Sequence, residues 1–222
     1  PGDFGAISGF LSQLSSTQAT KFLDETPKDL KSWGLDKPQA TIRADEALLK
    51  IGRKTEGGYA AQNSASPAVF EIPATLFDQA NRPLKDWRQK QFVDFKETEL
   101  SKLEVKARGG VKTLAKQDKK WRVSGGEASD AVHQAAFDLL LNLQALTAQE
   151  FIDQPQAPES YGFDKPALEV SYNDRSIQLG SKGGKVYARL ARNGQYAPPV
   201  YELAPGTLEN FKQSLDTLFE KK

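Results

Sequence analysis

The chain has 222 residues, with 30 Lys and Arg against 29 Asp and Glu and a formal net charge of +1. This length allows one large or two small domains, and the balanced charge provides no overall field that would draw the chain to nucleic acid. There is no Cys and no Met, and His133 is the single histidine. These counts exclude disulfides, thiolate nucleophiles and multi-histidine metal sites, and we predict no cofactor.

The first half of the chain begins with a predicted helix from about Asp3 to Ala19. A Trp-Gly-Leu-Asp-Lys-Pro sequence at 33–38 follows and leads into short strands, and a closing helix begins near Thr75. In this sequence Gly permits a left-handed turn, Asp can bond its own backbone, and Pro holds the preceding Lys extended. We therefore predict a corner that leads into a β-strand.

The second half of the chain begins with polar and apolar residues that alternate over 102–108, ahead of a turn at Gly109-Gly110. This period of two continues over 111–116 and 120–123 and predicts a three-stranded antiparallel meander. Ser129 or Asp130 then caps a helix with apolar residues at helical spacing. Four strands and a helix that begins near Pro205 complete the pattern; the strands are at 167–172, 175–180, 185–192 and 199–203.

An internal repeat connects the two halves. The sequence at 33–38 recurs as Tyr-Gly-Phe-Asp-Lys-Pro at 161–166, an offset of 128 (162 − 34). The same offset carries Ile42 onto Val170 and Tyr59 onto Tyr187, while 69–72 matches 200–203 at an offset of 131. We predict an α+β protein of two tandem copies of an antiparallel sheet with flanking helices, with the copies at 1–96 and 97–222.

The meander occurs in the second copy only. At the repeat offset, residues 101–123 would map ahead of Pro1, and the chain opens without Met. We therefore expect a processed or excised piece whose first copy has lost its opening strands by truncation. The alternative is a meander that is present once, as a bridge between the copies.

The repeated corner also supplies four candidate partner contacts. Turning the chain into a strand explains the five residue types of Gly-x-Asp-Lys-Pro, so a structural role is favoured. The alternative is that a ligand or partner contacts the exposed acidic and basic side chains, which are Asp36, Lys37, Asp164 and Lys165.

Catalytic interpretations find little support. His133 would need an orienting carboxylate and a nucleophile, and the first copy has Ala6 or Ile7 near the equivalent position. Residues 181–185 resemble a phosphate loop but join two strands instead of entering a helix. We predict that the protein is not an enzyme, with no catalytic, cofactor-binding or metal-binding residues.

Charge is unevenly distributed along the chain. Residues 96–122 include nine basic and four acidic residues, while 137–164 include five acidic residues and no basic ones. Lys102, Lys106 and Arg108 take outward positions of their strand, where charge limits edge pairing, and solvated faces are the favoured interpretation. Docking on an anionic partner or on membrane headgroups is the alternative. Aromatic residues are not interleaved on this face, so we expect no nucleic-acid partner.

Several features together resemble a known family. They are the duplicated corner at 33–38 and 161–166, Trp121 at the end of the meander just ahead of an Asp-capped helix, and the Pro-Leu-Lys-Asp-Trp-Arg run at 83–88. The chain resembles the bacterial domain of unknown function family 4340, whose members are typically anchored by an N-terminal transmembrane helix and look like neighbours of gliding-motility-type ABC transporter components. This resemblance implies a periplasmic or other extracytoplasmic domain, tethered to the inner membrane by an upstream helix that is absent from this chain.

Two functions remain open from the sequence. We favour a non-enzymatic accessory or scaffold domain that contacts a membrane protein complex, such as ABC transporter components. The alternative is a module that binds a small molecule, a glycan or a peptide at a site between the two repeats. A hydrolase with paired carboxylates is the least favoured, because nothing in the order of the residues places such a pair across a cleft.

Overall fold

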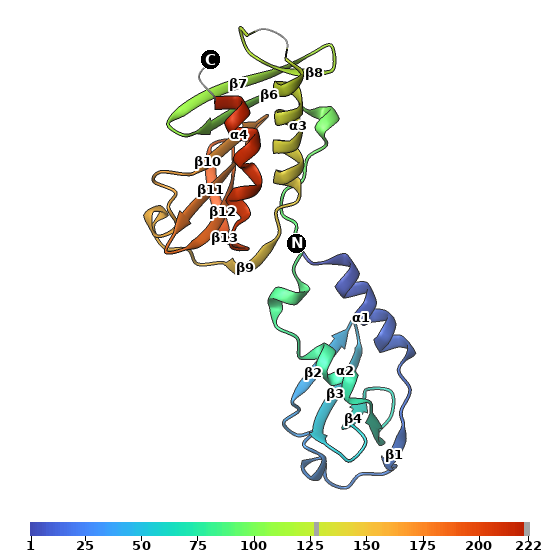
Figure 1. Ribbon diagram of the computed structural model, residues 1–222. Coiled ribbons are helices and arrows are strands. Elements are labelled where there is room, and N and C mark those ends of the chain that lie inside the picture. The colour runs from blue at the N-terminus through green and yellow to red at the C-terminus, as the bar shows by residue number, and fades with distance from the viewer. Residues whose placement is uncertain (127–128, 220–222) are drawn as a thin grey trace. The chain divides into compact units, whose positions relative to one another are not determined.

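The computed structural model of the chain describes residues 1–126 and 129–219 (Figure 1). The chain divides into two compact units, Pro1–Gln89 (unit 1) and Lys90–Lys222 (unit 2), and each is described by itself. Each unit contains one antiparallel sheet with helices, so the predicted α+β class is confirmed. Within the described residues, no helix has the length and apolar character required to span a membrane.

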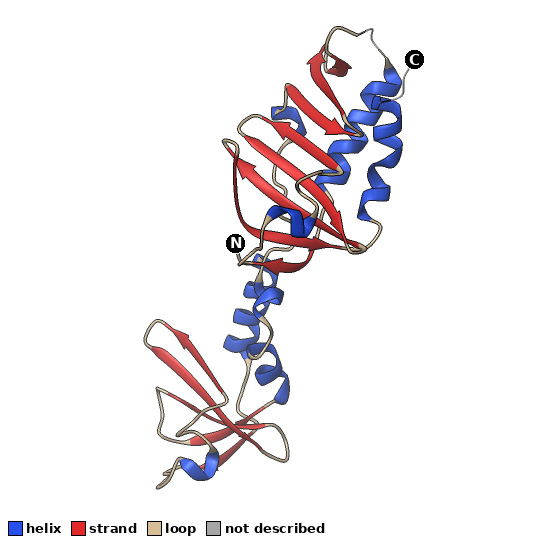
Figure 2. Cartoon of the chain, turned by 90° about the vertical axis from the view of Figure 1, so that its left-hand side faces the viewer, coloured by secondary structure: helices blue, strands red, loops and turns tan. Residues whose placement is uncertain are grey.

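Unit 1 contains a five-stranded sheet in the order β1-β5-β4-β3-β2. Its helices α1 and α2 pack on one face of this sheet, where Phe10, Leu14 and Leu76 meet Ile51 and Ile72 (Figure 2). In chain order the elements are α1 (Phe4–Ser16), β1 (Lys21–Asp24), the 3-10 helix η1 (Lys31–Trp33), β2 (Ala40–Ala44), β3 (Ala47–Lys54), β4 (Tyr59–Asn63), β5 (Val69–Ile72), α2 (Ala74–Ala80) and the 3-10 helix η2 (Leu84–Trp87).

Unit 2 contains an eight-stranded sheet in the order β8-β7-β6-β10-β11-β12-β13-β9. Helices α3 and α4 lie side by side on one face of it (Figure 2). In chain order the elements are the 3-10 helix η3 (Glu97–Glu99), β6 (Lys102–Ala107), β7 (Gly110–Gln117), β8 (Lys120–Val123), α3 (Asp130–Gln144), β9 (Ala148–Ile152), the 3-10 helix η4 (Pro158–Tyr161), β10 (Leu168–Tyr172), β11 (Arg175–Lys182), β12 (Lys185–Arg192), β13 (Gln195–Leu203), the 3-10 helix η5 (Thr207–Phe211) and α4 (Lys212–Phe219).

The alternation that predicted the meander also decides which side chains enter the core of unit 2. Leu103, Val105 and Ala107 of β6 are buried beneath the helices, while Lys102 and Lys106 point to the other face. Helix α3 begins at its N-cap Ser129, whose hydroxyl accepts a hydrogen bond from the backbone N–H of Val132 at 3.4 Å. Its apolar stripe is buried against the same core: Ala135, Ala136, Leu139, Leu140 and Leu143.

The boundary between the units lies at 89/90, whereas the sequence predicts it at 96/97. The difference arises because Phe92, Val93 and Phe95 pack on the core of unit 2. The ring of Phe92 stacks on Tyr201 with 3.8 Å between centroids, and Phe95 meets Tyr172 edge-on at 5.1 Å. These residues lie outside any helix or strand, so their assignment to unit 2 depends on tertiary contacts.

Both repeated corners depend on a close approach between a carbonyl group and a glycine. Gly34 and Gly162 end η1 and η4 with φ of +67° and +75°. The preceding carbonyl then lies so close to the next strand that a Cβ atom on Gly52 would be 2.1 Å from the oxygen of Trp33. In unit 2 the corresponding distance, from Gly180 to the oxygen of Tyr161, is 2.3 Å. Only glycine fits these two strand positions.

One equivalence inferred from the repeat is wrong by one residue. Ala61 pairs with Phe70 in unit 1 and Ala188 pairs with Tyr201 in unit 2, so β4 and β12 correspond at an offset of 127 (188 − 61). Tyr59 therefore corresponds to Val186 and not to Tyr187. The two tyrosines point to opposite faces, Tyr59 toward Phe77 of α2 and Tyr187 toward Tyr161. A register shift in the β3–β4 pair, between Ile51 and Lys54, accounts for the difference.

We predict that Gly52→Ala destabilises unit 1 by about 3 kcal/mol, because a methyl group at this position must displace the backbone carbonyl of Trp33. Urea unfolding followed by tryptophan fluorescence measures this change. The control is Gly9→Ala in the exposed part of α1, where a Cβ atom meets nothing within 4 Å. Alanine at position 9 should stabilise the helix by up to about 1 kcal/mol. Equal effects of the two substitutions would contradict the close approach.

Candidate functional site

The four candidate residues of the repeated corners are exposed. Asp36 and Lys37 follow η1, and Asp164 and Lys165 follow η4, in both cases just ahead of the strand that the corner opens. None of the four forms an ion pair within the described residues. The glycines and the prolines of the corner have structural roles, while the charged side chains remain available for contact.

The three candidate residues of the meander are placed differently from one another. Lys102 is exposed and forms no ion pair within the described residues. The ammonium group of Lys106 lies 3.0 Å from the carboxylate of Glu169 and 3.2 Å from that of Glu104. The hydrogen bond to Glu169 is the main cause that raises the pKa of Lys106. Arg108, in the β6–β7 turn, pairs with Asp216 of α4.

Other basic side chains of the meander are also paired within unit 2. Lys116 lies 2.7 Å from Glu97, and Lys120 lies 2.7 Å from Asp130. The positive excess that the sequence shows at 96–122 is therefore partly balanced by carboxylates from other elements. These pairs reduce the extent of any anionic docking face on the meander.

His133 has a structural contact. Its Nδ1 atom accepts a hydrogen bond from the backbone N–H of Trp121 at 3.2 Å, which joins α3 to β8. The indole of Trp121 is fully buried, and its N–H donates to Glu97 at 3.1 Å. Among residues 1–126 and 129–219, no three His, Asp or Glu side chains come together as a metal ion would require.

Sequence reasoning missed a polar ladder on the open face of the larger sheet. Lys106 contacts Glu169, the amide group of Gln178 donates to Glu169, and Nε of Arg189 donates to Gln178 at 2.8 Å. These side chains come from the neighbouring strands β6, β10, β11 and β12. The contacts could not be inferred along the chain because each one joins two strands.

Arg189 lies at one end of the ladder between two aromatic rings. Its guanidinium carbon is 4.5 Å from the centroid of Phe163 and 3.8 Å from that of Tyr196. Burial lowers the pKa of this half-buried arginine. A small cavity of about 110 Å³ adjoins it and is lined partly by Pro155, Pro158 and Pro198. This arrangement holds a planar cation in one orientation beside an apolar rim, which suits a carboxylate group.

Unit 1 forms five strands that correspond to β9–β13 of unit 2, without this arginine. Gln62 occupies the position of Arg189 at the β4–β12 offset of 127 (189 − 62), and Leu35 occupies the position of Phe163. The strand arrangement of the repeat therefore does not require a cation between two rings at this position. This difference marks Arg189 as a candidate binding residue.

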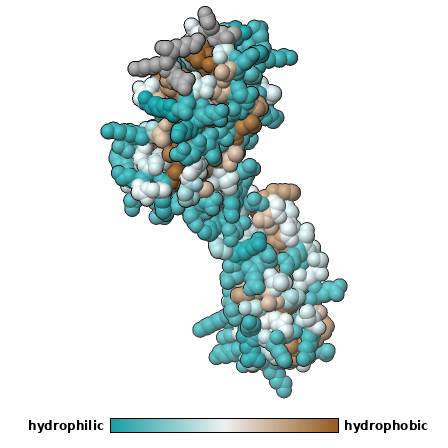
Figure 3. All heavy atoms as spheres, viewed as in Figure 1, coloured by the Kyte–Doolittle hydropathy of each residue, from teal (hydrophilic) through white to brown (hydrophobic). Residues whose placement is uncertain are grey.

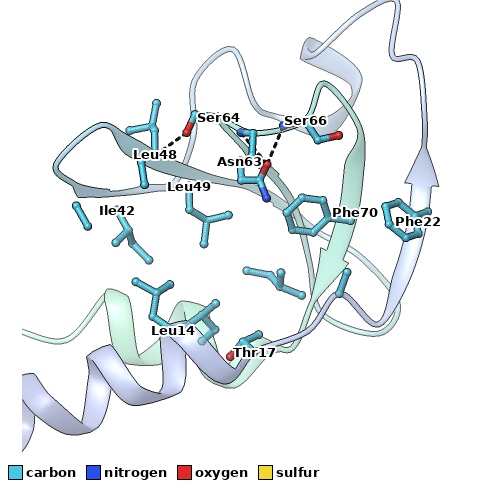
Figure 4. A pocket seen from close by; sticks show the side chains of 16 residues that line it. Leu14, Thr17, Phe22, Ile42, Leu48, Leu49, Asn63, Ser64, Ser66 and Phe70 are labelled. Carbon is cyan, nitrogen blue, oxygen red and sulfur yellow. Dashed lines mark hydrogen bonds between the residues drawn. The ribbon is translucent and has the colours of Figure 1, made fainter.

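An apolar groove of about 520 Å³ lies over one end of the sheet of unit 1. Figure 4 shows Leu14, Phe22, Ile42, Leu49 and Phe70 lining it, from α1 and from strands β1, β2, β3 and β5. No charged side chain contributes to the lining, which includes Thr17, Asn63, Ser64 and Ser66 as its polar members. The groove thus offers space for apolar groups and lacks a carboxylate or imidazole that could act as acid or base.

Hydrogen bonds hold the rim of the groove in place. The hydroxyl of Ser64 accepts a hydrogen bond from the backbone N–H of Leu48 at 3.0 Å (Figure 4). The side-chain oxygen of Asn63 accepts one from the backbone N–H of Ser66, also at 3.0 Å (Figure 4). Phe22 is 64% exposed at the edge. The groove is a preformed surface of unit 1 alone.

Glu71 is a buried carboxylate on β5. It accepts hydrogen bonds from the hydroxyl of Thr55 at 2.6 Å, from that of Thr20 at 3.0 Å and from the backbone N–H of Gly57 at 3.2 Å. These bonds, that of Thr55 foremost, lower the pKa of Glu71. A carboxylate held ionised by three donors ties the β3–β4 loop to β5 and is unsuited to act as a general acid.

We predict that Glu71→Gln lowers the melting temperature at pH 7 and that the difference from the original protein shrinks below pH 4.5. The ordinary pKa of this carboxyl is 4.5, and it is lowered in the folded state. Its stabilisation is therefore complete above pH 4.5 and is lost as the pH falls through the lowered pKa. Thermal unfolding between pH 3 and pH 7 measures this, with the exposed neighbour Glu56→Gln as control. A difference that stays constant over this range would refute the assignment.

Comparisons with known proteins establish the family. No curated protein and no solved structure matches the chain. The model of a domain of unknown function, DUF4340, matches residues 1–166, which include all of unit 1 and unit 2 through the second corner. The match covers well over half of the chain and confirms the resemblance drawn from the repeated corners. The chain belongs to the DUF4340 family.

Proposed function

We propose that this chain is a non-enzymatic accessory or scaffold module that acts through protein contacts, and that Arg189 is a point of contact. The carrying observation is the guanidinium group held between Phe163 and Tyr196 on the open face of the larger sheet. The partner would be a membrane protein complex of the transporter type. The module would lie outside the cytoplasm, tethered to the membrane in the full-length protein.

The geometry of Arg189 supports recognition of a carboxylate. Nε is bonded to Gln178, and the terminal nitrogens have no hydrogen-bond partner within the described residues. The two rings already restrict the side chain, so little conformational entropy is lost when an acidic side chain or a chain terminus binds. A bidentate pair with a carboxylate is the geometry that arginine favours.

Membership of the DUF4340 family supports the setting of the proposal. The resemblance drawn from the sequence implies an N-terminal transmembrane anchor and a place beside ABC transporter components, and the proposal adopts both. An extracytoplasmic scaffold would need contact surfaces and no catalytic group. A surface arginine with free donors meets that requirement.

We predict that Arg189→Gln weakens capture of the partner by about tenfold or more, because a hydrogen bond to a charged group contributes roughly 1.5–3 kcal/mol. The measurement is photo-crosslinking in membranes of the source organism, with a photoreactive residue in place of Gln156 beside the arginine. Arg192→Gln is the matched control, because Arg192 lies on the same strand and pairs with Asp174 at 2.9 Å.

The two variants separate the possible outcomes. Loss of a specific membrane-protein crosslink with Arg189→Gln but not with Arg192→Gln supports the proposal. Equal crosslinking by both variants would show that the contact lies on another surface. If the protein that retains Arg189 and Arg192 forms no crosslink with any membrane protein, the scaffold function is refuted.

A further inference from the structure

The sheet of unit 1 ends at a strand whose counterpart in unit 2 is paired on both sides. In unit 2, β10 pairs with β11 and also with β6, antiparallel, with Leu168 opposite Ala107 and Ser171 opposite Glu104. In unit 1, whose residues are all described, the corresponding β2 pairs with β3 alone. The outer edge of β2 therefore presents backbone groups that the sheet does not satisfy.

The apolar stripe of α1 is also less buried than that of α3. The offset of 129 that carries Phe22 onto Phe151 (151 − 22) superposes the two stripes, and it places Phe4, in place of Ala6 or Ile7, at the position of His133. The five positions of α3 are at most 5% exposed and pack with β8 and α4: Ala135, Ala136, Leu139, Leu140 and Leu143. The matching positions of α1 are Ala6, Ile7, Phe10, Leu11 and Leu14.

Two of these positions of α1 reach the surface. Ile7 is 39% exposed and Leu11 is 52% exposed, and tan side chains are visible at the upper end of α1 in Figure 3. In unit 2 the equivalent stripe is covered by α4 and by β8 of the meander, whose Trp121 is fully buried. Unit 1 has the stripe but lacks this cover.

The groove of unit 1 corresponds, by the repeat offsets, to a region of unit 2 that is covered. Ala44 and Phe70 of the groove correspond to Tyr172 and Tyr201, at the offsets of 128 (172 − 44) and 131 (201 − 70). Phe95 packs edge-on against Tyr172, and Phe92 stacks on Tyr201. The two phenylalanines ahead of β6 thus fill in unit 2 the region that is open in unit 1.

We propose that unit 1 is completed by a polypeptide segment with the pattern of residues 92–123. Two large apolar side chains three residues apart enter the groove, the following strand adds antiparallel to the edge of β2, and the returning strands cover Ile7 and Leu11 of α1. The segment belongs to the same polypeptide and lies ahead of α1, because in unit 2 the meander lies directly ahead of α3. This inference does not depend on the proposed scaffold function.

Other occupants satisfy fewer of the observations. A small apolar molecule could fill the groove, but it would leave the edge of β2 unpaired and the stripe of α1 exposed. A second copy of the chain would have to release its own meander, whose Leu103, Leu114 and Trp121 are fully buried. Strand addition combined with side chains in a pocket accounts for the edge, the groove and the stripe together.

Because the sequence contains no cysteine, a single introduced thiol can report on the accessibility of the groove. Ala44→Cys introduces a single thiol at the groove, and Lys28→Cys introduces one at an exposed turn outside it. Each variant is prepared twice, as residues 1–222 and as the polypeptide that includes whatever precedes residue 1 in the gene product. The rate of maleimide labelling is compared, and hydrogen exchange of the β2 amides is followed without any substitution.

We expect labelling at position 44 to be at least ten times slower in the longer polypeptide, with the β2 amides protected there and labelling at position 28 unchanged. Equal rates at position 44 in the two polypeptides would overturn the proposal, as would a gene product that begins at residue 1. Slowing within residues 1–222 that grows with protein concentration would overturn it in favour of a second copy. Slowing caused only by an added apolar compound would overturn it in favour of a small ligand.

Discussion

The close approach of a backbone carbonyl to a strand glycine is the constraint on which both units depend. The oxygen of Trp33 over Gly52, and that of Tyr161 over Gly180, leave no room for a Cβ atom. Each contact fixes a corner. The residue two positions after the carbonyl, Leu35 in unit 1 and Phe163 in unit 2, is thereby buried on the sheet face opposite the helices. In unit 2 that buried ring is the surface on which Arg189 lies, so the candidate contact residue depends on a corner whose first role is structural.

The two units share one sheet plan and differ in its cover. Unit 2 has one large core in which the meander, α3, α4 and the aromatic residues at 92 and 95 all take part. Unit 1 has two small clusters centred on Ile51 and Leu35. Its groove corresponds to the region that Phe92 and Phe95 fill in unit 2, ahead of the meander. Removing apolar surface of this kind from water lowers the free energy of the folded chain. The incomplete cover of unit 1 is therefore the most informative difference between the repeats.

Charges that are separate in the sequence are paired in space. Lys106, Lys116 and Lys120 of the basic segment meet carboxylates from β10, η3 and α3. Ion pairs near the surface add little to stability, so these pairs serve solubility more than stability. Of the three lysines, Lys106 and Lys116 lie on β6 and β7 inside the sheet, and Lys120 lies on the edge strand β8. Arg189 differs from them because two rings orient it and its partner is the neutral Gln178.

Local patterns were sufficient for the repeat, the meander, the apolar stripes of the helices and the corners, because each depends on periodicity or on the turn chemistry of a few adjacent residues. They were insufficient for the register of β4, where a shift of one residue sends Tyr59 and Tyr187 to opposite faces. They also missed the position of Arg189 between Phe163 and Tyr196 and the packing of Phe92 on Tyr201. Such contacts join different strands, and only the folded chain decides them because strand register and side-chain direction are set by the whole sheet.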